Sequence, residues 1–182
     1  MSIAVDAAEQ VFITGRFAGT GVYGLNAVGP ADLFVASFNS RGNLQYAKRG
    51  GGSGDDSGNA LALDAAGNVY VLGQFVGSTS YEATQLPTSA GTNLVVLRLK
   101  PSLGLDWVAV GPAVKADSIA VDRIGHVYVS GEYAQTVLFG AISLTAAGAT
   151  DLFVAQLPSE VLGSAGRWTW VNSIGDLGVE GR

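Results

Sequence analysis

The sequence contains no cysteine, and it has one histidine and one methionine among 182 residues. Without cysteine, the chain has no disulfide, no thiol nucleophile and no thiolate metal ligand. His126 is the single histidine, so one chain cannot build a multi-histidine metal site. Because His126 directly precedes a predicted strand, we interpret it as a polar turn residue rather than a catalytic base.

Charged residues are also scarce, at 14% of the chain, and ten basic residues oppose fifteen acidic ones. No basic cluster extends beyond Lys48 and Arg49, which argues against nucleic acid and anionic membranes as partners. Residues 2–6 already belong to a repeat, so we expect no signal peptide in this chain. The longest uncharged stretch, 133–150, contains polar residues and glycines, and we expect strands and loops there rather than membrane insertion.

The residues that are abundant point to a β fold. Apolar residues make up 48% of the chain, and 26 glycines accompany many valines and aromatic residues. This composition favours short strands joined by tight turns over helices, which would contain more Glu, Lys, Gln and Met. We therefore predict a folded, all-β protein.

Three copies of one unit follow each other at a spacing of about 58 residues. Residues 3–6, 61–64 and 119–122 read Ile-Ala-Val-Asp, Leu-Ala-Leu-Asp and Ile-Ala-Val-Asp. Each copy holds about four apolar, β-prone runs separated by turn residues, which predicts one four-stranded antiparallel sheet per copy. We interpret residues 1–182 as one repeat domain of three β-propeller blades, at about 1–58, 59–116 and 117–182.

The turn between the first two strands of each copy has a recognisable chemistry. Asp64 can cap a type I turn, and Gly67 can adopt the left-handed conformation that returns the chain as a hairpin. Asp122 and Gly125 repeat this arrangement. In the first copy Glu9 stands at the glycine position, where we expect slight backbone strain.

The repeats closely resemble those of the bacterial SBBP family, which is named for its seven-bladed β-propeller repeats. The resemblance is carried by residues 59–71 (NALALDAAGNVYV), 51–58 (GGSGDDSG) and 151–155 (DLFVA). It implies a propeller fold and a parent protein that is extracellular or on the cell surface, as in Bacteroidetes. It implies no enzymatic activity and no cofactor.

Three blades would leave two apolar blade faces uncovered, since propellers close with roughly four to eight blades. We predict that two chains associate head to tail and close a six-bladed ring, and the alternative is a piece of a longer propeller. The function predicted is non-enzymatic binding or scaffolding, with a protein or glycan ligand. The alternatives are a lectin-like glycan-binding propeller and a hydrolase or lyase with a site at the channel mouth.

Two groups of carboxylates are candidate sites, although no catalytic or cofactor-binding residue is assigned. Asp6, Asp64 and Asp122 would surround the ring axis on the channel side and could hold a cation or basic ligand, but turn capping accounts for them equally. The calcium candidates share a glycine-aspartate loop that also fits a plain connection between blades. They are Asp55, Asp56 and the corresponding Asp176.

Aromatic residues recur on the fourth predicted strand of the copies. They are Tyr46, Trp107, Trp168 and Trp170. Packing between blades is the favoured interpretation, and an exposed surface that stacks on carbohydrate is the alternative.

Overall fold

The computed structural model describes residues 1–159 and 168–174. Within them it contains 18 β-strands and no helix, which confirms the all-β prediction. No helix of the described chain could therefore cross a membrane.

Each copy of the repeat forms four long antiparallel strands that neighbour each other in chain order. The first sheet contains β1 (Ser2–Val5), β2 (Val11–Phe17), β5 (Asp32–Phe38) and β6 (Leu44–Gly52). The second contains β7 (Ser57–Leu63), β8 (Val69–Val76), β11 (Thr92–Leu99) and β12 (Leu105–Gly111). The third contains β13 (Lys115–Val121), β14 (Val127–Tyr133), β17 (Asp151–Leu157) and β18 (Trp170–Ile174).

The turns between the first and second strands form as the sequence predicts. The backbone N–H of Gly67 donates to the carbonyl oxygen of Asp64, and Gly67 has a φ of 81°. Glu9 occupies the same place in the first copy with a φ of 60°. A residue with a Cβ atom is disfavoured in this left-handed region, so Glu9 adopts the conformation for which the sequence predicts strain.

A short hairpin separates the second and third strands of each sheet. These hairpins are β3–β4 (Thr20–Val22, Leu25–Asn26), β9–β10 (Thr79–Tyr81, Thr84–Gln85) and β15–β16 (Thr136–Phe139, Ile142–Thr145). The β9 strand also pairs with the end of β6, where Gly50 lies opposite Tyr81. This pairing joins the second copy to the fourth strand of the first sheet.

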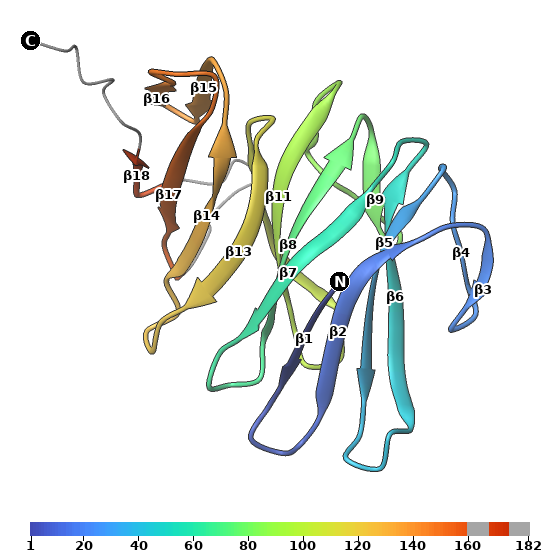
Figure 1. Ribbon diagram of the computed structural model, residues 1–182. Helices are drawn as coiled ribbons and strands as arrows, with labels where there is room; N and C mark the ends of the chain where they lie inside the picture. Colours follow the sequence, from blue (N-terminus) through green and yellow to red (C-terminus); the bar gives the residue numbers. More distant parts are fainter. Residues whose placement is uncertain (160–167, 175–182) are drawn as a thin grey trace, which may run out of the picture.

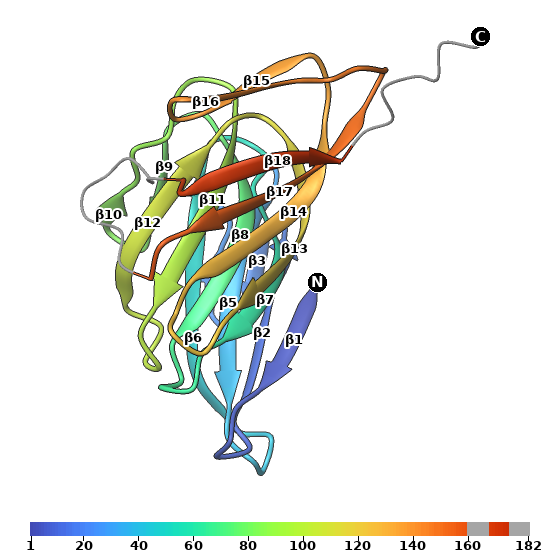
Figure 2. The ribbon, with the colours of Figure 1, turned by 90° about the vertical axis from the view of Figure 1, so that its left-hand side faces the viewer.

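The three sheets stand face to face in chain order, as the blue, green and orange ribbons of Figure 1 show. Figure 2 looks onto the third sheet, with the other two behind it. The first strands lie together, because β7 contacts both β1 and β13. One apolar cluster fills the space between the first and second sheets, and another fills the space between the second and third.

The two clusters use opposite faces of the second sheet. Val71 and Leu97 face the first sheet, whereas Leu72 and Val96 face the third. Because successive side chains of a strand point to opposite faces, a strand buried on both faces is apolar throughout. The continuous apolar runs of β8 and β11 follow from this position.

Candidate binding surfaces

The three aspartates predicted on the channel side cap the turns between the first and second strands. Asp64 Oδ1 accepts hydrogen bonds from the N–H groups of Ala66 and Asn68, both at 2.9 Å. The Asn68 side chain donates to its other oxygen at 2.8 Å, and the Tyr70 hydroxyl donates at 3.1 Å. Partial burial opposes ionisation of Asp64, but these hydrogen bonds hold its pKa below the usual 3.8.

Asp6 and Asp122 make the same caps in the other two copies. Asp6 Oδ1 accepts from the N–H of Gln10 at 2.8 Å, and Asp122 Oδ1 accepts from the N–H of His126 at 2.9 Å. The His126 ring nitrogen Nδ1 lies 3.0 Å from Asp122 Oδ2. Partial burial again opposes ionisation, yet the His126 hydrogen bonds lower the pKa of Asp122. The only histidine thus contributes to a turn cap.

The calcium candidates of the glycine-aspartate loop point in different directions. Asp55 is half exposed and pairs with Arg16, with 3.0 Å between Oδ2 and Nη2. Asp56 is fully buried and accepts hydrogen bonds from the N–H groups of Gly52 and Val76, both at 2.7 Å. Burial raises the pKa of Asp56 despite these hydrogen bonds. Asp176 lies outside the described residues.

Asp32, a buried carboxylate that the sequence analysis did not single out, lies beside Asp56. It is fully buried, and its Oδ2 accepts from the N–H of Val28 at 2.9 Å and from Arg49 Nη1 at 2.7 Å. Its other oxygen, Oδ1, has no hydrogen-bond partner among the described residues. The sequence signal was a polar residue that recurs at the start of the third strand, as Asn93 and Asp151.

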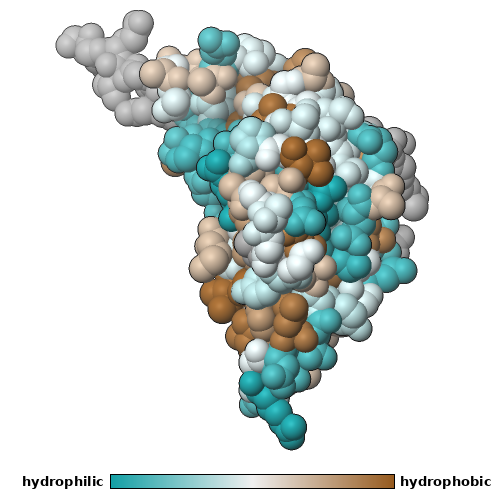
Figure 3. Space-filling view, turned by 90° about the vertical axis from the view of Figure 1, so that its right-hand side faces the viewer, coloured by the Kyte–Doolittle hydropathy of each residue, from teal (hydrophilic) through white to brown (hydrophobic). Residues whose placement is uncertain are grey.

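The first sheet has one face that no other sheet covers. Ile3 and Val5 on this face are 66% and 57% exposed, whereas their equivalents in the second copy, Leu61 and Leu63, pack against the first sheet. Tyr23 of the turn between β3 and β4 lies over Phe34 and Phe38 elsewhere on this face. Figure 3 shows apolar side chains gathered on its lower half. We name this surface the leading face.

The third sheet has a matching uncovered face on the opposite side of the stack. Leu152 is 49% exposed there, while its equivalents Leu33 and Leu94 are buried between sheets. Ile174 on the same face is 57% exposed, and a groove of about 310 Å³ runs beside both residues. We name this surface the trailing face. Both ends of the stack therefore expose apolar positions that are buried inside it.

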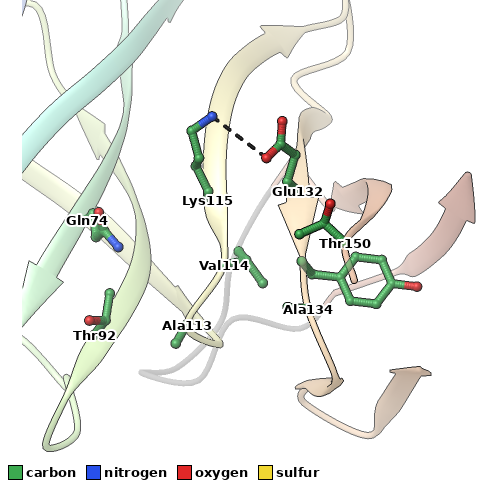
Figure 4. Close-up of a pocket in the computed structure, with 9 residues that line it drawn as sticks. Gln74, Thr92, Ala113, Val114, Lys115, Glu132, Ala134 and Thr150 are labelled. Atoms are coloured by element: carbon green, nitrogen blue, oxygen red, sulfur yellow. Dashed lines mark ion pairs between the residues drawn. The ribbon is translucent and has the colours of Figure 1, made fainter. Parts of the chain in front are cut away.

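A pocket of about 350 Å³ opens between the second and third sheets. Ala113 and Val114 line it, and Lys115 and Glu132 lie 3.8 Å apart at its polar side (Figure 4). The equivalent pocket between the first and second sheets measures about 320 Å³ and is lined by Arg16 and Asp55, among others. The same cleft thus recurs at both junctions with different side chains.

The four aromatic residues predicted on the fourth strands do not gather into one surface, and Trp168 lies just before β18 rather than in it. Trp168 is 7% exposed and packs edge-on against Phe139. Trp107 packs against Tyr70 and Trp170 against Tyr128. Tyr46 alone of the four is clearly exposed, on the first sheet.

No group of three or more His, Asp or Glu side chains that could hold a metal ion was found in residues 1–159 and 168–174. The candidate surfaces are therefore the two open faces, the clefts between sheets and the buried pair of Asp32 and Asp56.

Comparison with known proteins points to a repeat fold. No family model matches the chain, so the resemblance to SBBP repeats is not supported at the level of that family. The chain is 28% identical over 184 residues to an uncharacterised WD repeat-containing protein of Acanthamoeba polyphaga mimivirus. The match covers 88% of this chain but 13% of that protein. Since WD repeats form four-stranded propeller blades, this similarity suggests a repeat protein of the β-propeller type.

Proposed function

We propose that this chain is a non-enzymatic β-propeller scaffold for protein binding, and that two copies close a six-bladed ring head to tail. The observation that carries the proposal is the equivalence between each open face and a face buried inside the stack. By the resemblance of its repeats, we propose an extracellular or cell-surface location for the parent protein.

The leading and trailing faces match each other, because each is equivalent through the repeat to a face that is buried between sheets. The second sheet packs one of its faces against the first sheet, and the leading face consists of the equivalent positions of the first sheet. Ile3 on the leading face, for example, is equivalent to Leu61. The first sheet packs its other face against the second sheet, and the trailing face consists of the equivalent positions of the third sheet. Leu152 on the trailing face is equivalent to Leu33. A trailing face set on the leading face of another copy would therefore repeat the existing junctions.

The β9–β10 hairpin of the second copy supports the same direction of assembly. Inside the chain, β9 pairs with the fourth strand of the preceding sheet, β6. The corresponding hairpin strand of the first copy, β3, pairs with β4 alone within the described chain. In a head-to-tail ring, β3 would meet the fourth strand of the partner's third sheet. Two chains with three sheets each would give six blades, within the usual four to eight.

Light scattering over a concentration series tests ring closure directly. We expect a particle with a mass near twice 18.6 kDa. Ile3→Lys and Leu152→Lys should each give a monomer, because either charge would be buried at a junction. Ile124→Lys is the control, since Ile124 is 71% exposed on the turn between β13 and β14.

Mixing the two monomeric variants distinguishes head-to-tail from face-to-same-face pairing. A mixed ring retains one junction without a lysine, so the mixture should recover part of the dimer. Pairing of two leading faces would leave the Leu152→Lys protein dimeric. A native chain that stays monomeric at all concentrations would refute ring closure by a second copy.

A further inference from the structure

The side chains of Asp32 and Asp56 approach the same point at the end of β6. A Cβ atom placed on Gly51 would lie 2.7 Å from Asp32 Oδ1 and 2.8 Å from Asp56 Oδ2. Gly51 has a φ of 148° and no side chain, so both carboxylates pack against its Cα atom from the same side. Two oxygen ligands of one calcium ion lie up to about 5 Å apart, which is compatible with this arrangement.

The carboxylate of Asp32 is incompletely satisfied. Its Oδ1 is buried and has no hydrogen-bond donor in the part of the chain that the structure describes. Buried polar atoms are almost always paired, because an unpaired one loses its hydration without compensation. The orphan oxygen therefore points to a positive or protic partner on the side of Asp56.

The second copy of the repeat shows what this position requires. Asn93 replaces Asp32, and its Oδ1 accepts from the N–H of Ser89 as Asp32 Oδ2 accepts from Val28. The amide Nδ2 of Asn93 thus corresponds to the orphan oxygen. It donates to the carbonyl oxygens of Ser89 and Gly91, both at 3.0 Å. The second copy therefore has a hydrogen-bond donor where the first copy has an unpaired acceptor.

The second carboxylate is also lost in that copy. The loop before β13 (residues 112–114) is one residue shorter than the loop before β7 (residues 53–56), and Val114 stands where the first copy has Asp56. In the first copy Arg49 pairs with Asp32, so an ionised Asp56 would add a fully buried negative charge for which the described residues supply no ion pair. A buried charge of this kind requires a compensating cation or proton.

We propose that Asp32 and Asp56 bind one divalent cation of the calcium class at the end of β6. Calcium takes carboxylate, main-chain carbonyl and water oxygens in a flexible shell, so two carboxylates suffice when the backbone and water complete it. The site differs from the sequence-based candidates, because Asp32 rather than Asp55 accompanies Asp56. It lies within one chain, and its test does not depend on ring closure.

Calorimetric titration with calcium chloride, after dialysis against a chelator, tests the site. We expect one ion per chain and a higher melting temperature with calcium than with chelator. Asp32→Asn should weaken binding at least tenfold, and Asn93 shows that asparagine fits this position. Asp55→Asn is the matched control, because Asp55 is the adjacent residue but is exposed and paired with Arg16; it should change affinity less than twofold.

Three results would overturn the proposal. One is the absence of binding heat together with an unchanged melting temperature at millimolar calcium. Another is a melting temperature that does not change with calcium but rises both in the Asp32→Asn variant and on acidification of the native protein. Such a result would mean that a proton shared by the two carboxylates, and not a cation, compensates their charge. Calcium binding that survives both Asp32→Asn and Asp56→Asn would likewise refute this location.

Discussion

The two junctions between sheets are built on the same repeat but are held together differently. Between the first and second sheets, β9 pairs with β6, and Asp56 receives N–H groups from Gly52 and Val76. Between the second and third sheets, β15 pairs with β16 alone among the strands that the structure describes. The position of Gly51 is occupied there by Pro112, which has no N–H to donate to a sheet.

The difference shows which parts of the repeat set the fold and which adjust the junction. The four long strands keep their order and pairing in all three copies. Apolar packing joins both pairs of neighbouring sheets. The loop after the fourth strand, in contrast, decides whether polar groups are added to that packing. At the second junction, Trp168 and Phe139 supply aromatic packing, while a pocket remains beside Val114.

The largest expected effect comes from removing a buried aromatic side chain at the junction between the second and third sheets. Phe153 is fully buried and contacts Phe139 and Tyr133 at ring distances of 5.1 and 6.4 Å. Phe153→Ala should lower the free energy of unfolding by about 3–5 kcal/mol, measured by urea denaturation at fixed protein concentration. Leu138→Ala, at a side chain 60% exposed, is the control and should change stability little. A loss below about 1 kcal/mol in Phe153→Ala would show that this junction carries little of the stability.

At the junction between the first and second sheets, we expect a substitution of Gly51 to lower stability. An alanine there would place its Cβ atom against both carboxylates, and its backbone would have to keep a positive φ. Gly51→Ala should cost about 2–3 kcal/mol of unfolding free energy from crowding and backbone strain. Gly42→Ala is the matched control, since Gly42 also has a positive φ, 77°, but no heavy atom within 4 Å of the added Cβ. Its cost should be about 1 kcal/mol, and equal losses in both variants would remove the special role of the carboxylates.

The features that the sequence predicts correctly are those that recur. The all-β class, the capped turns and the left-handed position of Glu9 follow from patterns that appear three times, so each copy checks the others. Local chemistry fixes these features: Asp64 is able to cap its own turn whatever the neighbouring sheet does.

The features that the sequence does not reveal are contacts between segments that lie far apart in the chain. Asp32 begins a buried strand, and its meeting with Asp56 depends on how the loop after β6 folds back over the sheet. The pairing of β9 with β6 likewise joins residues about 30 positions apart, and local propensity does not encode such pairing. Asp55 and Asp56 are adjacent in sequence but differ in burial, because adjacent side chains in extended chain point to opposite sides.

The smallest expected effect compares the turns of the first and second copies. Glu9 and Gly67 hold the same left-handed place, with φ values of 60° and 81°. Glu9→Gly should stabilise the protein by about 0.5 kcal/mol, because relief of the strain exceeds the added freedom of glycine in the unfolded chain. Gly67→Glu should destabilise by about 1 kcal/mol, since the nearest atom to an added Cβ is Pro101 Cγ at 3.6 Å and the cost is confined to the backbone. Chemical denaturation of both variants beside the native chain measures the pair, and effects of the same sign would mean that contacts of the side chains, rather than the backbone conformation, distinguish the two turns.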